Sequence, residues 1–238
     1  MFRNRLSDSD PCLILVDYNF LLSWALQLYF VDSEGCSRRV RKIEPPQHSG
    51  IDKLVSHCLL IYNPFVGDAV RVPPANRFPY QSEVFGFGFH PRTGEFKVVR
   101  IVWYENDTDD ESMVQVFTVG TTEWRNKGAP PPQLTDEIGS PEALVEGSLH
   151  WVTVVRVGGV SPILDIISFE LADEVLEEIP HPPCQQLVSY GYSLSVLNGC
   201  LTAAGLVDTL HFDIWVMKQY RVKESWVKQF SFDPRFPG

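Results

Sequence analysis

The sequence predicts an all-β fold in which one four-stranded unit is repeated along the chain. In residues 84–101, two β-rich runs are joined by a Pro91-Arg92-Thr93-Gly94 turn. Related runs recur about every fifty residues, and no segment keeps a helical pattern of apolar residues for more than about three turns. A repeat of this length is typical of kelch-like β-propeller blades, which bury their apolar faces only by stacking against neighbouring blades.

Three complete blades are indicated by the strand-like runs and by the Gly, Pro and Asn residues between them. Their strands are expected at residues 84–89, 96–104, 113–119 and 123–127, at residues 143–145, 148–155, 163–171 and 175–179, and at residues 192–197, 200–206, 211–217 and 225–232. Pro91 and Gly94 suit a tight turn between two strands, and so do Asn198 and Gly199 in the last blade.

The N-terminal part of the sequence is less regular. The runs at residues 28–32 and 60–65 both resemble the third strand of a blade, yet a spacing of about thirty residues is too short for a whole blade. We therefore expect a hairpin to be missing near residues 55–58, and an incomplete or irregular propeller with partial N-terminal blades. The expected organisation is a disordered N-terminus at 1–10, one propeller-like domain at 11–233 and a tail at 234–238.

Charge and cysteine content argue against several classes of function. The formal net charge is −10 and the basic residues are scattered, so no nucleic-acid surface is expected. The most apolar early stretch, residues 20–31, is too short to cross a membrane, and the N-terminus lacks the pattern of a secretory signal. The five cysteines form no Cys-x-x-Cys pair, which predicts reduced thiols in the cytoplasm or nucleus.

The sequence predicts no catalytic, cofactor-binding or metal-binding residues. Ser148 lacks the elbow pattern of a hydrolase nucleophile, and the six histidines never fall in a compact metal-ligand spacing. The alternative is a propeller enzyme of the glycosidase or cyclase type, with carboxylates from Asp165, Asp213 and Glu170. The sequence alone places no pair of these carboxylates at the separation that acid-base hydrolysis requires.

Recognition of a partner is expected at one end of the sheets. In an antiparallel blade, the connection between the second and third strands and the connection to the next blade leave from the same side. Most turns on the other side are tighter than these connections, with residues 218–224 as the exception. Long loops on a rigid scaffold commonly carry recognition. Aromatic and arginine side chains anchor interfaces, while charges set specificity. The candidate partner-binding residues are Phe78, Tyr80, Asp109, Arg156 and Gln186.

Six short motifs occur in an order that matches a known family. They are Tyr62-Asn63-Pro64-Phe65, Gly86-Phe87-Gly88-Phe89-His90-Pro91, Glu123-Trp124-Arg125, Gly147-Ser148-Leu149-His150-Trp151, Ile167-Ser168-Phe169-Glu170-Leu171, and Ile214-Trp215-Val216-Met217 with Lys223-Glu224-Ser225-Trp226. In this order they resemble the F-box-associated interaction domain of plant F-box proteins. The resemblance covers nearly the whole chain. It implies a non-enzymatic protein-protein interaction domain, the substrate-recognition part of a ubiquitin-ligase subunit that acts in ubiquitin-dependent degradation.

The resemblance also implies partners. The expected partner is a target protein, which this domain would recognise. Family members carry an N-terminal F-box that docks onto the Skp adaptor of a cullin ubiquitin ligase, and nothing similar precedes Pro11. The Skp adaptor and the cullin ligase are therefore expected only as indirect partners, reached through another chain. Because members usually have a further hairpin before Asn63 and continue past the position of Gly238, a truncated, non-functional product is a further alternative.

Overall fold

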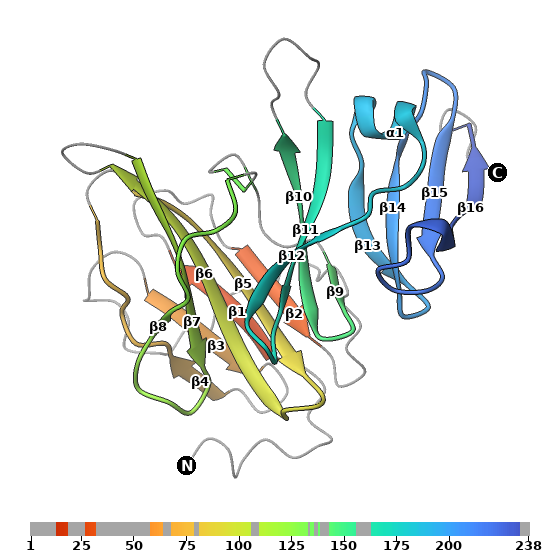
Figure 1. Cartoon of the computed structure of the whole chain (residues 1–238). Coiled ribbons are helices and arrows are strands. Elements are labelled where there is room, and N and C mark those ends of the chain that lie inside the picture. Colours follow the sequence, from red (N-terminus) through yellow and green to blue (C-terminus); the bar gives the residue numbers. More distant parts are fainter. Residues whose placement is uncertain are drawn as a thin grey trace.

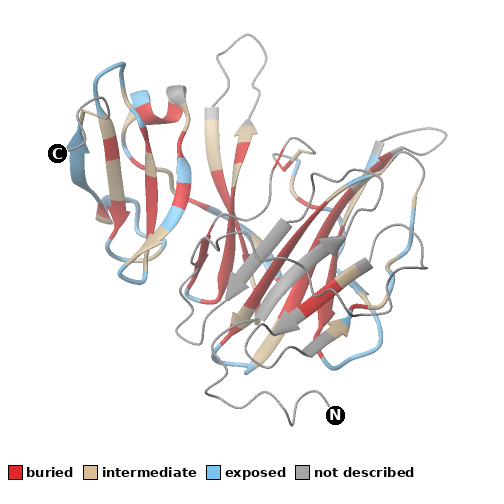
Figure 2. Cartoon of the chain, turned by 180° about the vertical axis from the view of Figure 1, so that it is seen from behind, coloured by how far each residue is buried: buried red, intermediate tan, exposed pale blue. Residues whose placement is uncertain are grey.

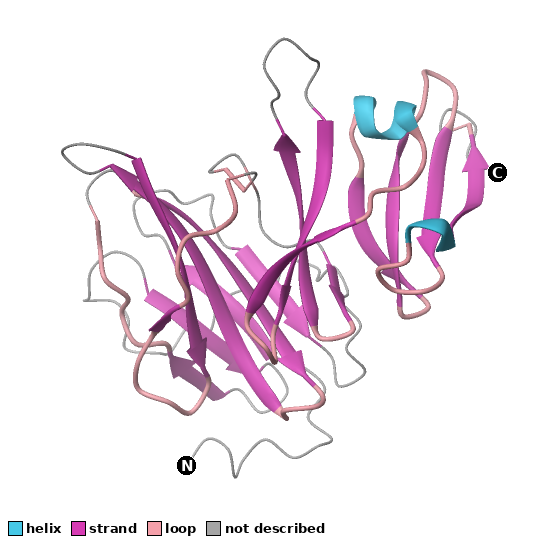
Figure 3. Ribbon diagram, in the orientation of Figure 1, coloured by secondary structure: helices cyan, strands magenta, loops and turns pink. Residues whose placement is uncertain are grey.

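Four antiparallel sheets of four strands each make up the described part of the chain. This computed structural model describes residues 13–18, 27–31, 58–63, 68–78, 81–105, 110–132, 134–135, 138, 143–155 and 163–233. Figure 1 and Figure 3 show the second, third and fourth sheets side by side in chain order, with the first sheet lying against the second. The predicted all-β, propeller-like fold is confirmed.

The first sheet differs from the partial blades expected at the N-terminus. It has the order β2-β1-β3-β4 and is formed by β1 (Leu13–Tyr18), β2 (Gln27–Val31), β3 (Cys58–Asn63) and β4 (Asp68–Arg71). The hairpin that seemed to be missing near residues 55–58 is supplied from earlier in the chain, because β1 pairs with both β2 and β3. The run at 28–32 is therefore part of an edge strand and not a third strand.

The second and third sheets are complete blades, as predicted. The second sheet is formed by β5 (Ser82–His90), β6 (Glu95–Glu105), β7 (Asp110–Thr118) and β8 (Arg125–Asn126). The third is formed by β9 (Ala143–Val145), β10 (Ser148–Val155), β11 (Ile163–Glu170) and β12 (Val175–Ile179). Strands β9, β10 and β12 have the predicted bounds.

The fourth sheet contains the last predicted blade. It is formed by β13 (Ser193–Leu197), β14 (Cys200–Leu206), β15 (Phe212–Met217) and β16 (Trp226–Phe232). A short helix, α1 (Gln185–Tyr190), precedes it, and a 3-10 turn, η1 (Lys223–Ser225), lies between its last two strands. Neither helical segment of the described chain has the length and apolar character needed to cross a membrane.

Two apolar cores hold neighbouring sheets together, and the buried residues of the strands are red in Figure 2. The first core joins the second and third sheets and includes Phe87, Trp151 and Ile167. The second joins the third and fourth sheets and includes Ile166 and Trp226. Because neighbouring residues of a strand point to opposite faces, the third sheet contributes to both cores and is covered on both sides.

Candidate interaction site

The antiparallel order of the second to fourth sheets divides their connections between two ends. We call one end the loop face: it is formed by the β6–β7, β10–β11 and β14–β15 connections and by the segments that lead from one sheet to the next. We call the other end the turn face: it is formed by the remaining connections within these sheets. In Figure 1 the loop face is at the top and the turn face at the bottom. The connections predicted to carry recognition therefore leave from one end.

Phe78, one of the predicted contact residues, is held in place at the loop face. Its ring stacks on that of Tyr104 with a centroid separation of 4.0 Å, and its backbone N–H donates to Oε1 of Gln81 at 2.7 Å. The Tyr104 hydroxyl donates to Oε2 of Glu111 at 2.6 Å. This hydrogen bond, together with burial and the negative charge of Glu111, raises the pKa of Tyr104. Phe78 is half-buried as a result.

A buried arginine supports the segment that leads to Phe78. Arg100 on β6 is 2% exposed. Its Nε donates to Glu83 at 2.6 Å, and its Nη1 donates to the side chain of Gln115 at 2.5 Å and to the carbonyl of Asn76 at 3.0 Å. The carboxylate of Glu83 compensates the buried charge, as a buried guanidinium requires. Arg100 therefore ties residues 72–78 to the middle of the second sheet.

Gln186, a second predicted contact residue, lies apart from Phe78. It is exposed on α1, whose Leu187 and Val188 anchor the helix in the second core. The structure thus places Phe78 beside the second sheet and Gln186 between the third and fourth, in separate parts of the loop face. The remaining three candidates, Tyr80, Asp109 and Arg156, lie outside the described residues.

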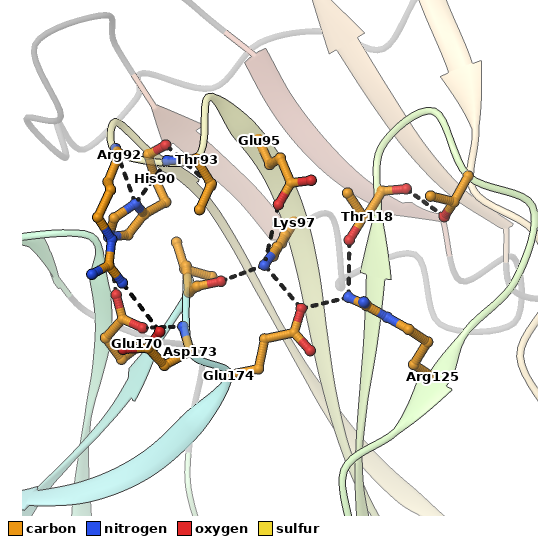
Figure 4. A network of polar contacts seen from close by, with 12 residues as sticks. His90, Arg92, Thr93, Glu95, Lys97, Thr118, Arg125, Glu170, Asp173 and Glu174 are labelled. Atoms are coloured by element: carbon orange, nitrogen blue, oxygen red, sulfur yellow. Dashed lines mark hydrogen bonds and ion pairs between the residues drawn. The ribbon is translucent and has the colours of Figure 1, made fainter.

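At the turn face, ion pairs connect the second and third sheets (Figure 4). The Lys97 side chain on β6 is 3% exposed, and its ammonium lies 2.9 Å from Oε1 of Glu174 in the β11–β12 turn. The same ammonium donates to the carbonyl of Leu171 at 2.5 Å. Arg125 and Lys127, which follow β7, pair with the Glu174 carboxylate as well. One carboxylate of the third sheet therefore holds three cations of the second.

Glu174 remains charged in this position. Burial alone raises its pKa, but hydrogen bonds from Lys97 and Lys127 and the charges of Lys97 and Arg125 outweigh burial and hold the pKa below its ordinary value. The residue also has a φ of 59°, a left-handed conformation that costs energy for a residue with a Cβ. The contacts with the second sheet compensate for this strain.

His90 forms a second link between the same sheets. Its Nε2 lies 2.9 Å from Oε1 of Glu170, and its Nδ1 accepts a hydrogen bond from the backbone N–H of Arg92 at 3.1 Å. Since Nδ1 accepts, Nε2 carries the hydrogen and donates to the carboxylate. Gly147 has a φ of 75°, and a Cβ at this position would overlap the His90 ring. His90 therefore fixes the β5–β6 turn against the third sheet.

The third and fourth sheets are connected in a related way. The imidazole of His150 on β10 is buried, and its Nε2 lies 2.8 Å from the Tyr220 hydroxyl in the β15–β16 connection. Its Nδ1 lies 3.4 Å from the carbonyl of Ala143, which assigns the hydrogen to Nδ1 and leaves Nε2 as the acceptor. Burial, assisted by the positive charge of Arg221, lowers the pKa of His150 to about 4. The ring is therefore neutral at neutral pH.

Two further contacts dock the β15–β16 connection onto the third sheet. Arg221 pairs with Glu177 of β12 at 2.5 Å, and Nε1 of Trp226 donates to the carbonyl of Pro180 at 2.7 Å. Arg221 has a φ of 66°, so this link, like that of Glu174, uses a residue in a left-handed conformation. Charged side chains at the turn face thus connect the second sheet with the third and the third sheet with the fourth.

The three carboxylates of the enzyme alternative each make a contact of their own. Glu170 pairs with His90 at 2.9 Å, Asp213 is buried in the fourth sheet at 3.0 Å from Lys228, and Asp165 accepts the backbone N–H of Ile166 at 2.8 Å. Within the described residues, no three His, Cys, Asp or Glu side chains are grouped as a metal ion would require. These contacts suit a rigid scaffold.

Sequence reasoning missed the polar links at the turn face. A signal for one of them is present, because Lys97 and Arg100 interrupt the otherwise apolar strand β6. Charged residues in a strand that is buried on both faces need partners. For Lys97, the identity of the partners depends on a turn more than seventy residues away, since its ammonium meets the Leu171 carbonyl 74 residues further along the chain.

Comparison with known proteins adds an independent finding. The family model described as the F-box associated beta propeller domain matches residues 51–238. An F-box protein of Arabidopsis thaliana, At3g07870, is 37% identical over 207 residues, which cover 78% of this chain and 49% of that protein. The F-box protein CPR1 of the same plant is 29% identical over 247 residues, which cover 89% of this chain and 59% of that protein.

The name of a third relative mentions the kelch repeat. The F-box/kelch-repeat protein At3g23880 of Arabidopsis thaliana is 23% identical over 177 residues, which cover 73% of this chain and 47% of that protein. The chain therefore spans about half the length of the curated relatives it matches.

Proposed function

Because the chain belongs to the F-box-associated β-propeller domain family, we propose that it is a non-enzymatic protein-interaction domain that recognises a target protein. In this proposal it acts as the substrate-recognition part of an F-box ubiquitin-ligase subunit in the cytoplasm or nucleus, and recognition directs the target to ubiquitin-dependent degradation. The Skp adaptor and the cullin ligase are indirect partners, because the sheets supply only the surface for the target.

The contrast between the two ends of the sheets is the observation that carries this proposal. At the turn face, the buried pair of Lys97 with Glu174 connects the second and third sheets, and the pair of Arg221 with Glu177 connects the third and fourth. The loop face bears the connections between the second and third strands and between successive sheets. A rigid scaffold that presents variable loops is the usual arrangement for recognition.

A capture experiment with matched variants tests the proposal. The tagged chain is expressed in the plant tissue of origin, and proteins labelled in its proximity are compared between wild type, a loop-face variant and a turn-face control. The loop-face variant combines Asp109→Ala, Arg156→Ala and Gln186→Ala, all from the predicted contact set. The control combines Arg92→Ala and Asp173→Ala, whose ion pair at 3.2 Å is exposed and contributes little to stability.

We expect the loop-face variant to lose a defined set of labelled proteins that the turn-face control retains. Equal labelling by the two variants would contradict the assignment of recognition to the loop face. Direct binding of the purified chain to the Skp adaptor would overturn the indirect role of the ligase subunits. Turnover of a small substrate by the purified chain would refute the non-enzymatic assignment.

A further inference from the structure

Side chains of the second sheet hold the segment that joins this sheet to the first. We call residues 72–78 the tethered segment; in Figure 1 it rises along the left side, from β4 toward the loop face. Nε1 of Trp124, in the β7–β8 connection, donates to the carbonyl of Pro73 at 2.8 Å. Nη1 of Arg100 donates to the carbonyl of Asn76 at 3.0 Å. Both contacts fix the main chain of a segment that has no regular secondary structure.

The two ends of the tethered segment are fixed as well. The backbone N–H of Val72 donates to the carbonyl of Leu59 on β3 at 2.9 Å, and the ring of Phe78 stacks on Tyr104. Two prolines follow Val72, and the ring of each proline restricts its backbone φ. A partner of this segment would therefore meet a surface that loses little conformational freedom on binding.

The buried guanidinium of Arg100 determines the position of the segment more than it adds stability. A buried ion pair such as that of Arg100 with Glu83 contributes little net stability compared with apolar residues of the same volume. The planar guanidinium can, however, donate to several acceptors in fixed directions, and here it reaches Glu83, Gln115 and the carbonyl of Asn76. An apolar residue at position 100 would fill the space but leave the segment unattached at Asn76.

The tethered segment offers a positive contact on an acidic chain. Pro74, Asn76 and Arg77 are exposed within it. Residues 69–82 hold two arginines, Arg71 and Arg77, and no acidic residue, whereas the whole chain has a formal net charge of −10. A guanidinium binds carboxylates through paired hydrogen bonds, and arginine is enriched at protein interfaces. The chemistry of the segment therefore favours an acidic partner.

On the basis of the function proposed above, we propose that the tethered segment is a part of the loop face that contacts the target protein. Arg77, with Asn76 beside it, binds an acidic segment of that target. Arg100 and Trp124 act as positioning residues, because they hold the main chain on which these two side chains lie. Phe78, which the sequence predicted as a contact, supports the segment from below through its stacked ring.

Proximity labelling in the plant tissue of origin tests the contact. Proteins that the tagged wild type labels and the tag alone does not are the target set. We expect Arg77→Glu to lower labelling of the target set by about tenfold or more, because the reversed charge repels an acidic segment. The matched control is Arg92→Glu, which makes the same charge change at an exposed arginine of the turn face and should label the target set like the wild type. Circular dichroism verifies that both variants are folded.

Hydrogen exchange of the purified chain tests the positioning. Trp124→Phe removes the donor to the Pro73 carbonyl and keeps an aromatic ring. We expect faster exchange at the backbone N–H of Phe78, which now donates to Gln81 at 2.7 Å. The backbone N–H of Val114 in the same sheet, which donates to the carbonyl of Gly128 at 2.8 Å, should exchange as in the wild type. Labelling of the target set should fall in the same variant.

Full labelling of the target set by a folded Arg77→Glu variant would overturn this inference and leave the proposed function standing. An equal loss in Arg92→Glu would do the same, since the effect would then be one of net charge. Faster exchange in Trp124→Phe with undiminished labelling would overturn the positioning role. A wild type that labels no more proteins than the tag alone would refute the proposed function itself, and the contact assigned to Arg77 with it.

Discussion

The ammonium of Lys97 in the second sheet lies 2.9 Å from the carboxylate of Glu174 in the third, and both side chains are almost completely buried. A buried ion pair contributes little net stability compared with apolar residues of the same volume, but removing one partner leaves an uncompensated charge. The pair therefore favours the one arrangement of the two sheets in which the ammonium and the carboxylate meet. Any displacement of the β11–β12 turn away from β6 would separate these charges.

Glu174→Gln should reduce the free energy of unfolding by about 3 kcal/mol, because the Lys97 ammonium loses its main counter-charge. The measurement is urea denaturation at neutral pH. The control is Asp173→Asn in the same turn, whose partner Arg92 is exposed and whose loss should cost less than about 1 kcal/mol. Equal losses for the two substitutions would show that the buried Lys97–Glu174 pair contributes no more to stability than the exposed pair does.

Acidification should destabilise the protein through His150. Burial lowers the pKa of this imidazole to about 4, from 6.5 in the unfolded chain. The unfolded state therefore binds the proton first. The contribution of His150 is complete above pH 6.5 and is lost as the pH falls toward 4. The loss over this range is on the order of 3 kcal/mol.

Denaturation of the wild type and His150→Gln at a series of pH values measures this effect. The substitution should remove part of the pH dependence between about pH 6.5 and 4. The difference between wild type and variant isolates His150 from carboxylates such as Glu174, whose lowered pKa also makes the fold lose stability in acid. Parallel pH curves for wild type and His150→Gln would contradict the assignment.

Much of the fold was predictable because its signals are local. Strands β10 and β14 begin directly after Gly147 and Gly199, both of which have a φ of 75°, and the alternation of apolar residues extends the strands from there. The position of β1 between β2 and β3 could not be predicted from such local signals. It brings together segments about forty residues apart, and no local pattern selects such a partner.

The candidate site was less predictable than the fold. Loop lengths identified the end of the sheets from which most of the long connections leave, but they did not reveal that Phe78 stacks on Tyr104. The links at the turn face depend on turn residues with positive φ, such as Glu174 and Arg221. These positions are commonly glycine, asparagine or aspartate. Composition therefore gave no reason to expect a charged residue there.

Gly147→Ala should destabilise the protein more than Gly199→Ala does. Both glycines have a φ of 75°, and only Gly147 has a neighbour in the path of a Cβ, the His90 ring. The strained backbone alone should cost about 1 kcal/mol at Gly199. At Gly147 the displaced ring also weakens the contact with Glu170, so the loss should exceed about 2 kcal/mol. Urea denaturation of the two variants compares them, and equal losses would mean that the ring moves aside freely.

Tyr220→Phe should loosen the β15–β16 connection without altering the apolar contact of its ring. The substitution removes the hydroxyl 2.8 Å from Nε2 of His150, and a buried acceptor without a donor costs about 1 to 3 kcal/mol. Hydrogen exchange should rise at the backbone N–H groups of Lys218 and Ser225, which now donate within this connection. Lys223→Ala, an exposed change in the same segment, is the control. Unchanged exchange in Tyr220→Phe would show that Arg221 and Trp226 hold the connection without help from the hydroxyl.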